Sequence, residues 1–174
     1  MSELSPEPTR HRLDALLSGS PVPVPDSFRT PVREDIPLLG ALMWDAYRGT
    51  PDERDAGDGP ASATEEVRLA FDGEYGPLLP EASFVAEEGG RAVAAALVTA
   101  WKDVPLLAFV FTAPSHTGRG LARRLIQATM GALAEQGYDR LSLAVTEANT
   151  RARALYESMG FAEVPPAGPA PAIR

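Results

Sequence analysis

A short glycine-containing segment of the sequence has the features of a phosphate-binding loop. An apolar run from Leu106 to Thr112 leads into Ser115-His-Thr-Gly-Arg-Gly120, and a helical pattern follows. The first N–H groups of a helix have no partner within the helix and lie at the positive end of its dipole, so they bind phosphate well. Gly118 and Gly120 lack the Cβ that would keep a diphosphate away. We therefore predict a diphosphate site here, although Gly-Arg-Gly before a helix is also ordinary turn chemistry.

Other phosphate-binding patterns are missing from this segment. No Gly-Lys-Ser/Thr is present, so it is not a Walker loop, and the three-glycine pattern of dinucleotide-binding folds is absent. Positive charge around the predicted helix start comes from Arg119, Arg123 and Arg124.

A second segment places two polar side chains on one face of a predicted helix. Asn149 and Tyr156 are seven positions apart, which brings their side chains to within about 20° of each other, two helical turns apart. Ala152 leaves room between them. A tyrosine on an amphipathic helix is often a core residue with a satisfied hydroxyl, so the spacing alone leaves both interpretations open.

Taken together, the two segments resemble the GCN5-related N-acetyltransferase (GNAT) superfamily. The acyl-CoA loop of this family has the form Gln/Arg-x-x-Gly-x-Gly/Ala, and residues 115–120 match it except at Ser115. The later family motif is Asn-x-x-Ala-x-x-Leu-Tyr-x-x-x-Gly-Phe. It is matched at Asn149, Ala152, Leu155, Tyr156, Gly160 and Phe161. With the order of elements included, the resemblance extends over residues 27–164.

The resemblance implies acetyl-CoA as co-substrate and no metal. In the family, the strand before the loop splays from its neighbour and pairs with the pantetheine arm, which places the thioester near residues 109–111. A backbone N–H on that strand would stabilise the tetrahedral oxyanion formed when an amine attacks directly. The residues expected to bind the co-substrate are Phe109, Val110, Phe111, Ser115, His116, Thr117, Gly118, Arg119, Gly120, Leu121, Ala122, Arg123, Asn149, Ala152 and Tyr156.

The resemblance also implies Tyr156 as the general acid for the departing thiolate. Ordinary pKa values of about 10 for tyrosine and about 8.5 for a thiol make complete proton transfer uphill, so we expect hydrogen-bond stabilisation of the sulfur. No general base is evident. Glu147, just before the last predicted helix, is the best-placed carboxylate, although a negative charge there also suits the helix N-terminus. His116 lies within the loop, and His11 lies far from both motifs.

The acceptor is expected to be an amine of a small molecule or peptide, bound by the first two helices and the loop between them. That region contains Trp44, Tyr47 and four acids, Asp52, Glu53, Asp55 and Asp58. The acids would suit a cationic amine, and a solvated acidic loop would explain them equally well. The first 80 residues carry 15 acidic and 7 basic side chains, which disfavours nucleic acid as a partner.

The helices and strands that the sequence predicts indicate an α+β fold with three layers around a mixed sheet. Helical spacing of apolar residues begins near Asp35, and Ser62-Ala-Thr-Glu65 fits a capping box for a second helix. The Gly-Gly turn at 89–90 predicts a hairpin within an antiparallel N-terminal meander. A parallel crossover should join the last two strands. The expected strands are 27–32, 83–86, 91–101, 106–112 and 141–145, and the later helices are 118–136 and 148–159.

The ends of the chain are rich in proline. Residues 1–26 contain five prolines and are predicted to be a flexible leader, 27–164 form the acyltransferase domain, and 165–174 form a tail. The family fold ends in a long hairpin, whose final strand inserts beside the fifth strand, but the tail's prolines cannot form a central strand. We therefore expect a truncated C-terminal hairpin. An uncovered edge invites pairing, so either a second subunit, giving a homodimer, or the leader should cover it.

Composition narrows the class of protein. The absence of cysteine excludes disulfides and a cysteine nucleophile. The longest apolar run, 92–98, is far shorter than the roughly 20 residues that span a bilayer, and no signal peptide is apparent, so a cytoplasmic location is expected. Two alternatives stay open: an acyl-CoA-binding module without catalysis, favoured by Ser115 and the short C-terminus, and a hydrolase using Ser115. The hydrolase is disfavoured because no histidine and acid are arranged around Ser115 in a Gly-x-Ser-x-Gly elbow.

Overall fold

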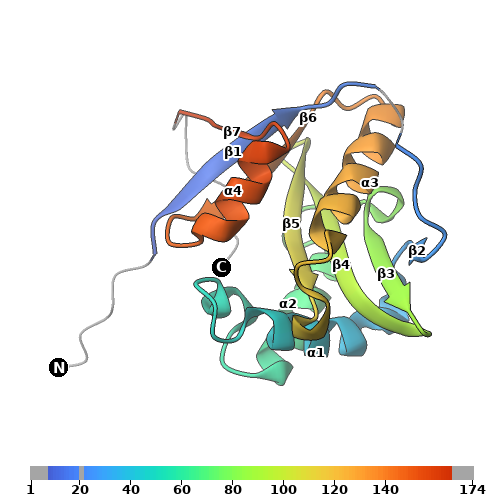
Figure 1. Cartoon of the computed structure of the whole chain (residues 1–174), viewed down its shortest axis with the longest axis vertical. Helices are drawn as coiled ribbons and strands as arrows, with labels where there is room; N and C mark the ends of the chain where they lie inside the picture. The colour runs from blue at the N-terminus through green and yellow to red at the C-terminus, as the bar shows by residue number, and fades with distance from the viewer. Residues whose placement is uncertain (1–7, 20–21, 166–174) are drawn as a thin grey trace.

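The computed structural model describes residues 8–19 and 22–165, which form one mixed sheet with helices on both faces (Figure 1). The strand order is β2-β3-β4-β5-β6-β1-β7. The strands are β1 (Arg10–Leu16), β2 (Phe28–Arg29), β3 (Phe84–Glu88), β4 (Arg91–Trp101), β5 (Val104–Thr112), β6 (Arg140–Thr146) and β7 (Ala162–Glu163). The helices are α1 (Ile36–Tyr47), α2 (Pro60–Asp72), α3 (Leu121–Glu135) and α4 (Thr150–Ser158). The predicted fold class is confirmed, although the strand expected at 27–32 is reduced to β2.

The antiparallel meander forms as predicted. β2, β3, β4 and β5 pair antiparallel in sequence order. Gly89 and Gly90 close the β3–β4 hairpin with φ values of 59° and 77°, a backbone conformation that glycine adopts at no steric cost. β5 and β6 are parallel, which confirms the crossover through α3, but their register is recorded only at Leu106↔Ser142.

The second helix begins earlier than its predicted capping box. α2 starts at Pro60, with Gly59 as N-cap and no side-chain cap. Proline suits the first helical turn because its missing N–H would have no partner there. Ser62 and Glu65 therefore lie inside the helix, where Glu65 pairs with Arg68. The capping-box prediction is wrong for this reason.

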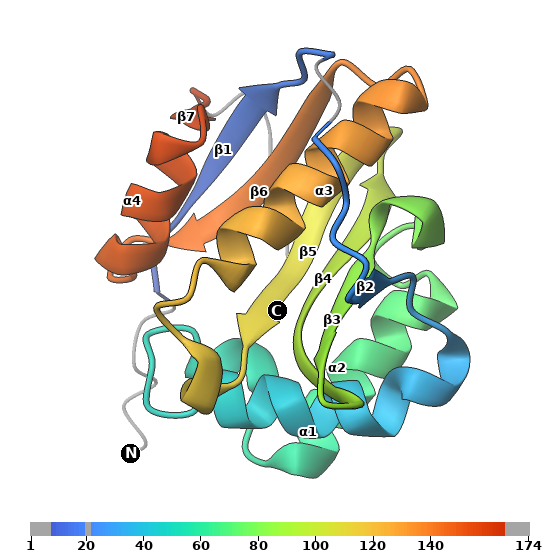
Figure 2. The same ribbon diagram turned by 45° about the vertical axis from the view of Figure 1, so that its right-hand side comes forward.

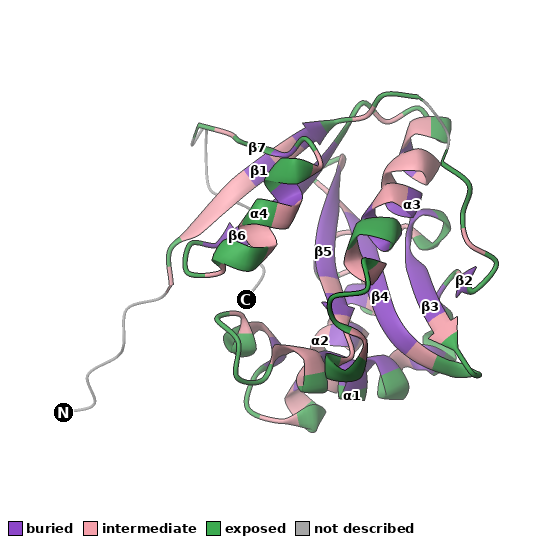
Figure 3. Ribbon diagram, in the orientation of Figure 1, coloured by how far each residue is buried: buried purple, intermediate pink, exposed green. Residues whose placement is uncertain are grey.

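Two apolar cores lie on opposite faces of the sheet. One is covered by α3 and α4 and the other by α1 and α2, as the ribbon in Figure 2 shows for the helices. Alternate residues of a strand point to opposite faces, so in β4 Ala94 and Ala96 pack with α3 and α4 while Ala95 and Leu97 pack with α1 and α2. Burial is greatest along the central strands β4 and β5 (Figure 3). The sheet is thus a rigid base for the loops at its edge.

The N-terminal strand corrects the prediction of a flexible leader, which is wrong over Arg10–Leu16. All seven residues of β1 pair antiparallel with β6, from Arg10↔Thr146 to Leu16↔Arg140. Leu13 and Ala15 both point into the core, with exposures of 0% and 1%. The free energy gained by burying them stabilises the strand in spite of its proline-rich flanks. Residues 1–7 and 20–21 lie outside the described residues.

β1 also settles what covers the edge of β6. Of the two possibilities, the N-terminal segment is the one observed, and a homodimer is not needed for this purpose. β7 pairs with β1 only at Leu13 and Asp14, in keeping with the expected truncated hairpin. Most of the predicted tail, residues 166–174, lies outside the described residues. Among the described helices, none has the length and apolar character required to cross a membrane.

Candidate functional site

A cleft of about 590 Å³ opens where β5 and β6 diverge. The two strands stay in register only near Leu106, so towards their carboxyl ends the backbone of β5 is exposed to the cleft on one side. Its walls come from β5, the loop before α3, the first turns of α4, and the segment that follows α1. Elements from both halves of the sequence therefore meet in one cavity.

The loop before α3 presents a row of backbone donors. Gly118 and Gly120 have φ values of 79° and 76°, and Gly120 is the N-cap of α3 without a side-chain cap. In the described part of the chain, no N–H from Thr117 to Arg123 has a recorded hydrogen-bond acceptor. A Cβ at either glycine would meet nothing within 4 Å, so the loop borders open space at both glycines. The arrangement suits an anion such as a diphosphate.

Side chains next to this loop hold it against the end of β3. Ser115 Oγ lies 2.7 Å from His116 Nδ1, His116 Nε2 lies 3.2 Å from Glu88 Oε2, and Arg119 Nη1 lies 3.7 Å from Glu88 Oε1. A histidine and an acid thus do lie beside Ser115, which sequence reasoning did not expect. Ser115 itself is exposed on a 3-10 turn and does not line the cleft. The contacts therefore fit a structural role better than a hydrolase.

Asn149 organises the start of α4. Its side-chain Oδ1 accepts a hydrogen bond of 3.1 Å from the N–H of Ala152, which caps the helix. Its Nδ2 donates to the carboxylate of Asp52, in the segment that follows α1. Asn149 therefore ties the last helix to the opposite wall of the cleft.

Tyr156 is a buried phenol that faces the cleft. It is 9% exposed, and its ring packs edge-on against Phe161 with centroids 5.8 Å apart. No hydrogen bond from its hydroxyl is recorded among the described residues, and Tyr156 is part of the cleft wall. Burial, and then the charge of Asp52, raise the pKa of Tyr156 above its ordinary value. The hydroxyl thus keeps its proton and can act as a donor.

Tyr47, at the end of α1, fixes the strand on which the resemblance places the thioester. Its hydroxyl donates to the carbonyl of Val110 at 3.0 Å, and its ring meets Phe111 edge-on at 6.0 Å. Burial raises the pKa of Tyr47 well above the ordinary value, and the charges of Asp55 and Asp52 add to this effect. Tyr47 is therefore a neutral positioning group at neutral pH.

An ion pair crosses the other end of the cleft. Arg10 of β1 pairs with Asp55, in the 3-10 turn after α1. Burial raises the pKa of Asp55 to about 6, although the charge of Arg10 and its hydrogen bond act in the opposite direction. Sequence reasoning missed Arg10 because it treated residues 1–26 as a leader. The alternation of Leu13 and Ala15 was the available signal for a strand there.

The structure brings twelve of the predicted site residues together in the cleft wall. They are Val110, Phe111, His116, Thr117, Gly118, Gly120, Leu121, Ala122, Arg123, Asn149, Ala152 and Tyr156. Arg123 Nη2 also donates to Ser158 Oγ at 2.8 Å, which holds α3 against α4.

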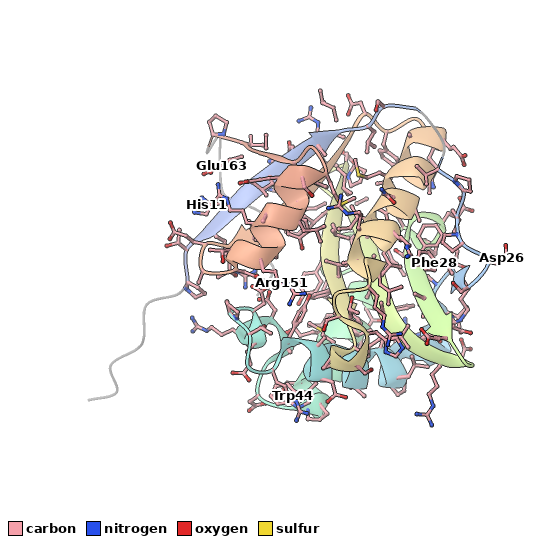
Figure 4. The ribbon with its side chains drawn as sticks, viewed as in Figure 1. His11, Asp26, Phe28, Trp44, Arg151 and Glu163 are labelled. Carbon is pink, nitrogen blue, oxygen red and sulfur yellow. The ribbon has the colours of Figure 1, made fainter. Side chains whose placement is uncertain are left out.

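Four predicted site residues lie elsewhere. Phe109 is 2% exposed in the core against Tyr75, and Ser115 and Arg119 stand outside the cleft wall. Glu147 is solvent-exposed, 3.7 Å from His11, at the edge formed by β1. His11 in turn contacts Glu163 at 2.8 Å (Figure 4). The position of Glu147 offers no support for a role as general base.

The predicted acceptor residues divide between the cleft and the surface. Tyr47, Asp52 and Asp55 line the cleft, whereas Glu53 and Asp58 are exposed and lie outside its wall. Trp44, on α1, is half-buried against the core that α1 and α2 form with the sheet (Figure 4).

Comparisons with known proteins agree with this geometry. The sequence profile described as the Acetyltransferase (GNAT) family matches residues 43–161. A mycothiol acetyltransferase of Beutenbergia cavernae is 47% identical over 51 residues, which is 29% of this chain and 17% of that protein. The matched segment is thus a small part of this curated relative.

Solved structures share the fold. A GCN5-related N-acetyltransferase from Sphaerobacter thermophilus has a TM-score of 0.67 and 21% identity, covering 91% of this chain and 50% of that one. The aminoglycoside N-acetyltransferase AAC(6')-Iy, solved in complex with CoA, has a TM-score of 0.59 and 18% identity, covering 82% and 91%.

The fold and the divergent-strand cleft define an acyltransferase-type domain. Since the family profile spans well over half of the chain, the chain belongs to the GNAT acetyltransferase family.

Proposed function

We propose that this chain is an acetyl-CoA-dependent N-acetyltransferase that acetylates an amine of a small molecule or peptide. The observation that carries the proposal is Tyr156, a buried residue whose hydroxyl has no partner in the described structure and which lines the same cleft as the open N–H groups before α3. A cleft with an anion site at one end and a free phenol at the other suits a long phosphorylated thioester.

The chain's own groups would bind the co-substrate at several points. The N–H groups of Thr117 to Arg123 suit the diphosphate, with Arg123 adding positive charge at the cleft wall. The exposed side of β5 would pair with the amide groups of the pantetheine arm. The Tyr47 hydroxyl donates to the Val110 carbonyl, which fixes the strand at the reacting end.

Acetyl transfer then requires one bond to form and one to break. A neutral amine attacks the carbonyl carbon, the C–N bond forms, and the C–S bond breaks as the thiolate leaves. The Tyr156 hydroxyl donates a hydrogen bond to the sulfur as negative charge develops there. Because burial raises the pKa of Tyr156, the phenol stays protonated during the step, and the final proton comes from the attacking nitrogen through water.

The acceptor is proposed only as an amine. The names of similar proteins refer to mycothiol and to aminoglycosides, and these substrates differ in size and charge. Their shared feature is the acetyl-accepting nitrogen, so the family relationship supports the reaction class rather than one acceptor.

The experiment is a thiol-release assay with acetyl-CoA and a panel of amines, with product masses measured for every amine that gives a signal. Acetyl-CoA binding is measured in parallel by calorimetry. We expect binding together with amine-dependent thiol release and a mass increase of one acetyl group. Binding without release by any amine would instead indicate a non-catalytic acyl-CoA-binding module, and absence of binding would refute the proposal.

A further inference from the structure

The acceptor end of the cleft contains a carboxylate that is not part of an ion pair. Arg10 is engaged by Asp55. Within the described residues, Asp52 has no ion pair, and the only side chain that donates to its carboxylate is the neutral amide of Asn149. Arg151 also lines the cleft, but it is solvent-exposed and makes no recorded ion pair with Asp52. One carboxylate in the cleft wall is therefore left without a cation.

This carboxylate is held next to the free phenol. Asn149 caps α4 with its Oδ1 and donates to Asp52 with its Nδ2, and Tyr156 lies two turns further along the same helix. The charge of Asp52 is close enough to Tyr156 to raise the pKa of the phenol. Since Tyr156 is only 9% exposed and its hydroxyl has no hydrogen-bond partner among the described residues, a carboxylate and a phenol line the same cleft and can both contact a ligand.

We propose that Asp52 binds the acceptor as its ammonium form and is the residue that selects a cationic amine. This inference rests on the proposed acetyl transfer and adds the charge class of its acceptor. Asp52 acts as a binding and specificity-determining residue, and the amine reaches the thioester after losing its proton to solvent. Arg10 neutralises Asp55, so an ammonium group of the acceptor would form its ion pair with Asp52.

The same charge arrangement disfavours acceptors that carry a carboxylate. An acceptor carboxylate next to Asp52 would be repelled, and Arg10 is already paired with Asp55. Only Arg151, at the solvent-exposed side of the cleft, could receive it. Three amines with the same three-carbon skeleton separate these cases: propylamine with one positive charge, 1,3-diaminopropane with two, and β-alanine with one of each sign.

The test compares these three amines in the thiol-release assay with the unmodified protein and two variants. Asp52→Asn keeps an oxygen that accepts from Asn149 and removes only the charge. Asp58→Asn is the matched control, because Asp58 lies six residues further along, is exposed and does not line the cleft. We expect Asp52→Asn to raise the KM for propylamine at least about tenfold, as loss of a charged hydrogen bond does. The KM for acetyl-CoA should be unchanged in both variants.

Failure of the inference about Asp52 can be distinguished from failure of the proposed function. If the unmodified protein acetylates propylamine and Asp52→Asn leaves its KM within twofold, or if β-alanine is the best of the three acceptors, the role of Asp52 is refuted while the proposed function stands. If no amine releases thiol, propylamine binding to the CoA-saturated protein is measured by calorimetry. Binding that Asp52→Asn abolishes supports the inference, whereas no binding, or binding that the variant retains, overturns it.

Discussion

Truncating Leu13 to alanine is expected to destabilise the protein by about 3 kcal/mol, since a buried leucine typically contributes about 2–5 kcal/mol. Leu13 lies in the middle of β1, is 0% exposed, and stands between Leu143 of β6 and Glu163 of β7. It belongs to the same core as α3 and α4, so these helices would line the resulting cavity. For a domain of this size, the loss corresponds to a fall in Tm of about 6–12 °C.

The measurement is urea denaturation, followed by circular dichroism, of Leu13→Ala and of Leu16→Ala as control. Leu16 is in the same strand but is 82% exposed, so its truncation should change the unfolding free energy by less than about 0.5 kcal/mol. If Leu13→Ala costs less than about 1 kcal/mol, β1 is not part of the cooperative fold. The account of how the edge of β6 is covered, and of how Arg10 reaches the cleft, would then fail.

Three further predictions concern the cleft. Tyr156→Phe should lower kcat at least about tenfold with little change in the KM for acetyl-CoA, and steady-state kinetics showing an unchanged kcat would remove Tyr156 from the mechanism. The pKa of Asp55 is about 6 against an ordinary 3.8 because it is buried, so between these pH values the folded protein holds a proton that the unfolded chain has released. The unfolding free energy relative to Asp55→Asn should therefore fall by about 3 kcal/mol as the pH rises from about 4 to about 6, and a constant difference in denaturation experiments would contradict this. Gly118→Ala should weaken acetyl-CoA binding about tenfold or more by calorimetry, because its Cβ would intrude on the open N–H groups, at a cost of about 1 kcal/mol in stability for the positive φ. Gly131→Ala, inside α3, is its control and should bind normally.

The residues around the cleft were largely predictable because they belong to two short segments that resemble GNAT motifs, although their spacing alone did not decide their role. Gly118 and Gly120 precede a strongly periodic helix, and Asn149, which is the N-cap of α4, precedes Tyr156 of the same helix by seven positions. The antiparallel meander was predictable from a local pattern, since Gly89-Gly90 joins two apolar runs. In each case the pattern lies among close neighbours in the chain.

The acceptor end depends on contacts that no local pattern encodes. Arg10 and Asp55 are 45 positions apart, and Asp52 and Asn149 are 97 apart. The strand that carries Arg10 is short and flanked by prolines, and it is stabilised by long-range pairing with β6 and by the burial of Leu13 and Ala15 in the core. The start of α2 was predicted wrongly for a different reason. The helix begins at Pro60, before the Ser62-Ala-Thr-Glu65 pattern that resembled a capping box.

The position of β1 has a consequence for synthesis on the ribosome. Leu16 pairs with Arg140, so at about 5–20 residues per second the strand leaves the exit tunnel on the order of ten seconds before its partner is made. During this interval its apolar side chains are exposed to other nascent chains and to chaperones. The meander can assemble early, but the docking of the first strand must be among the last events of folding.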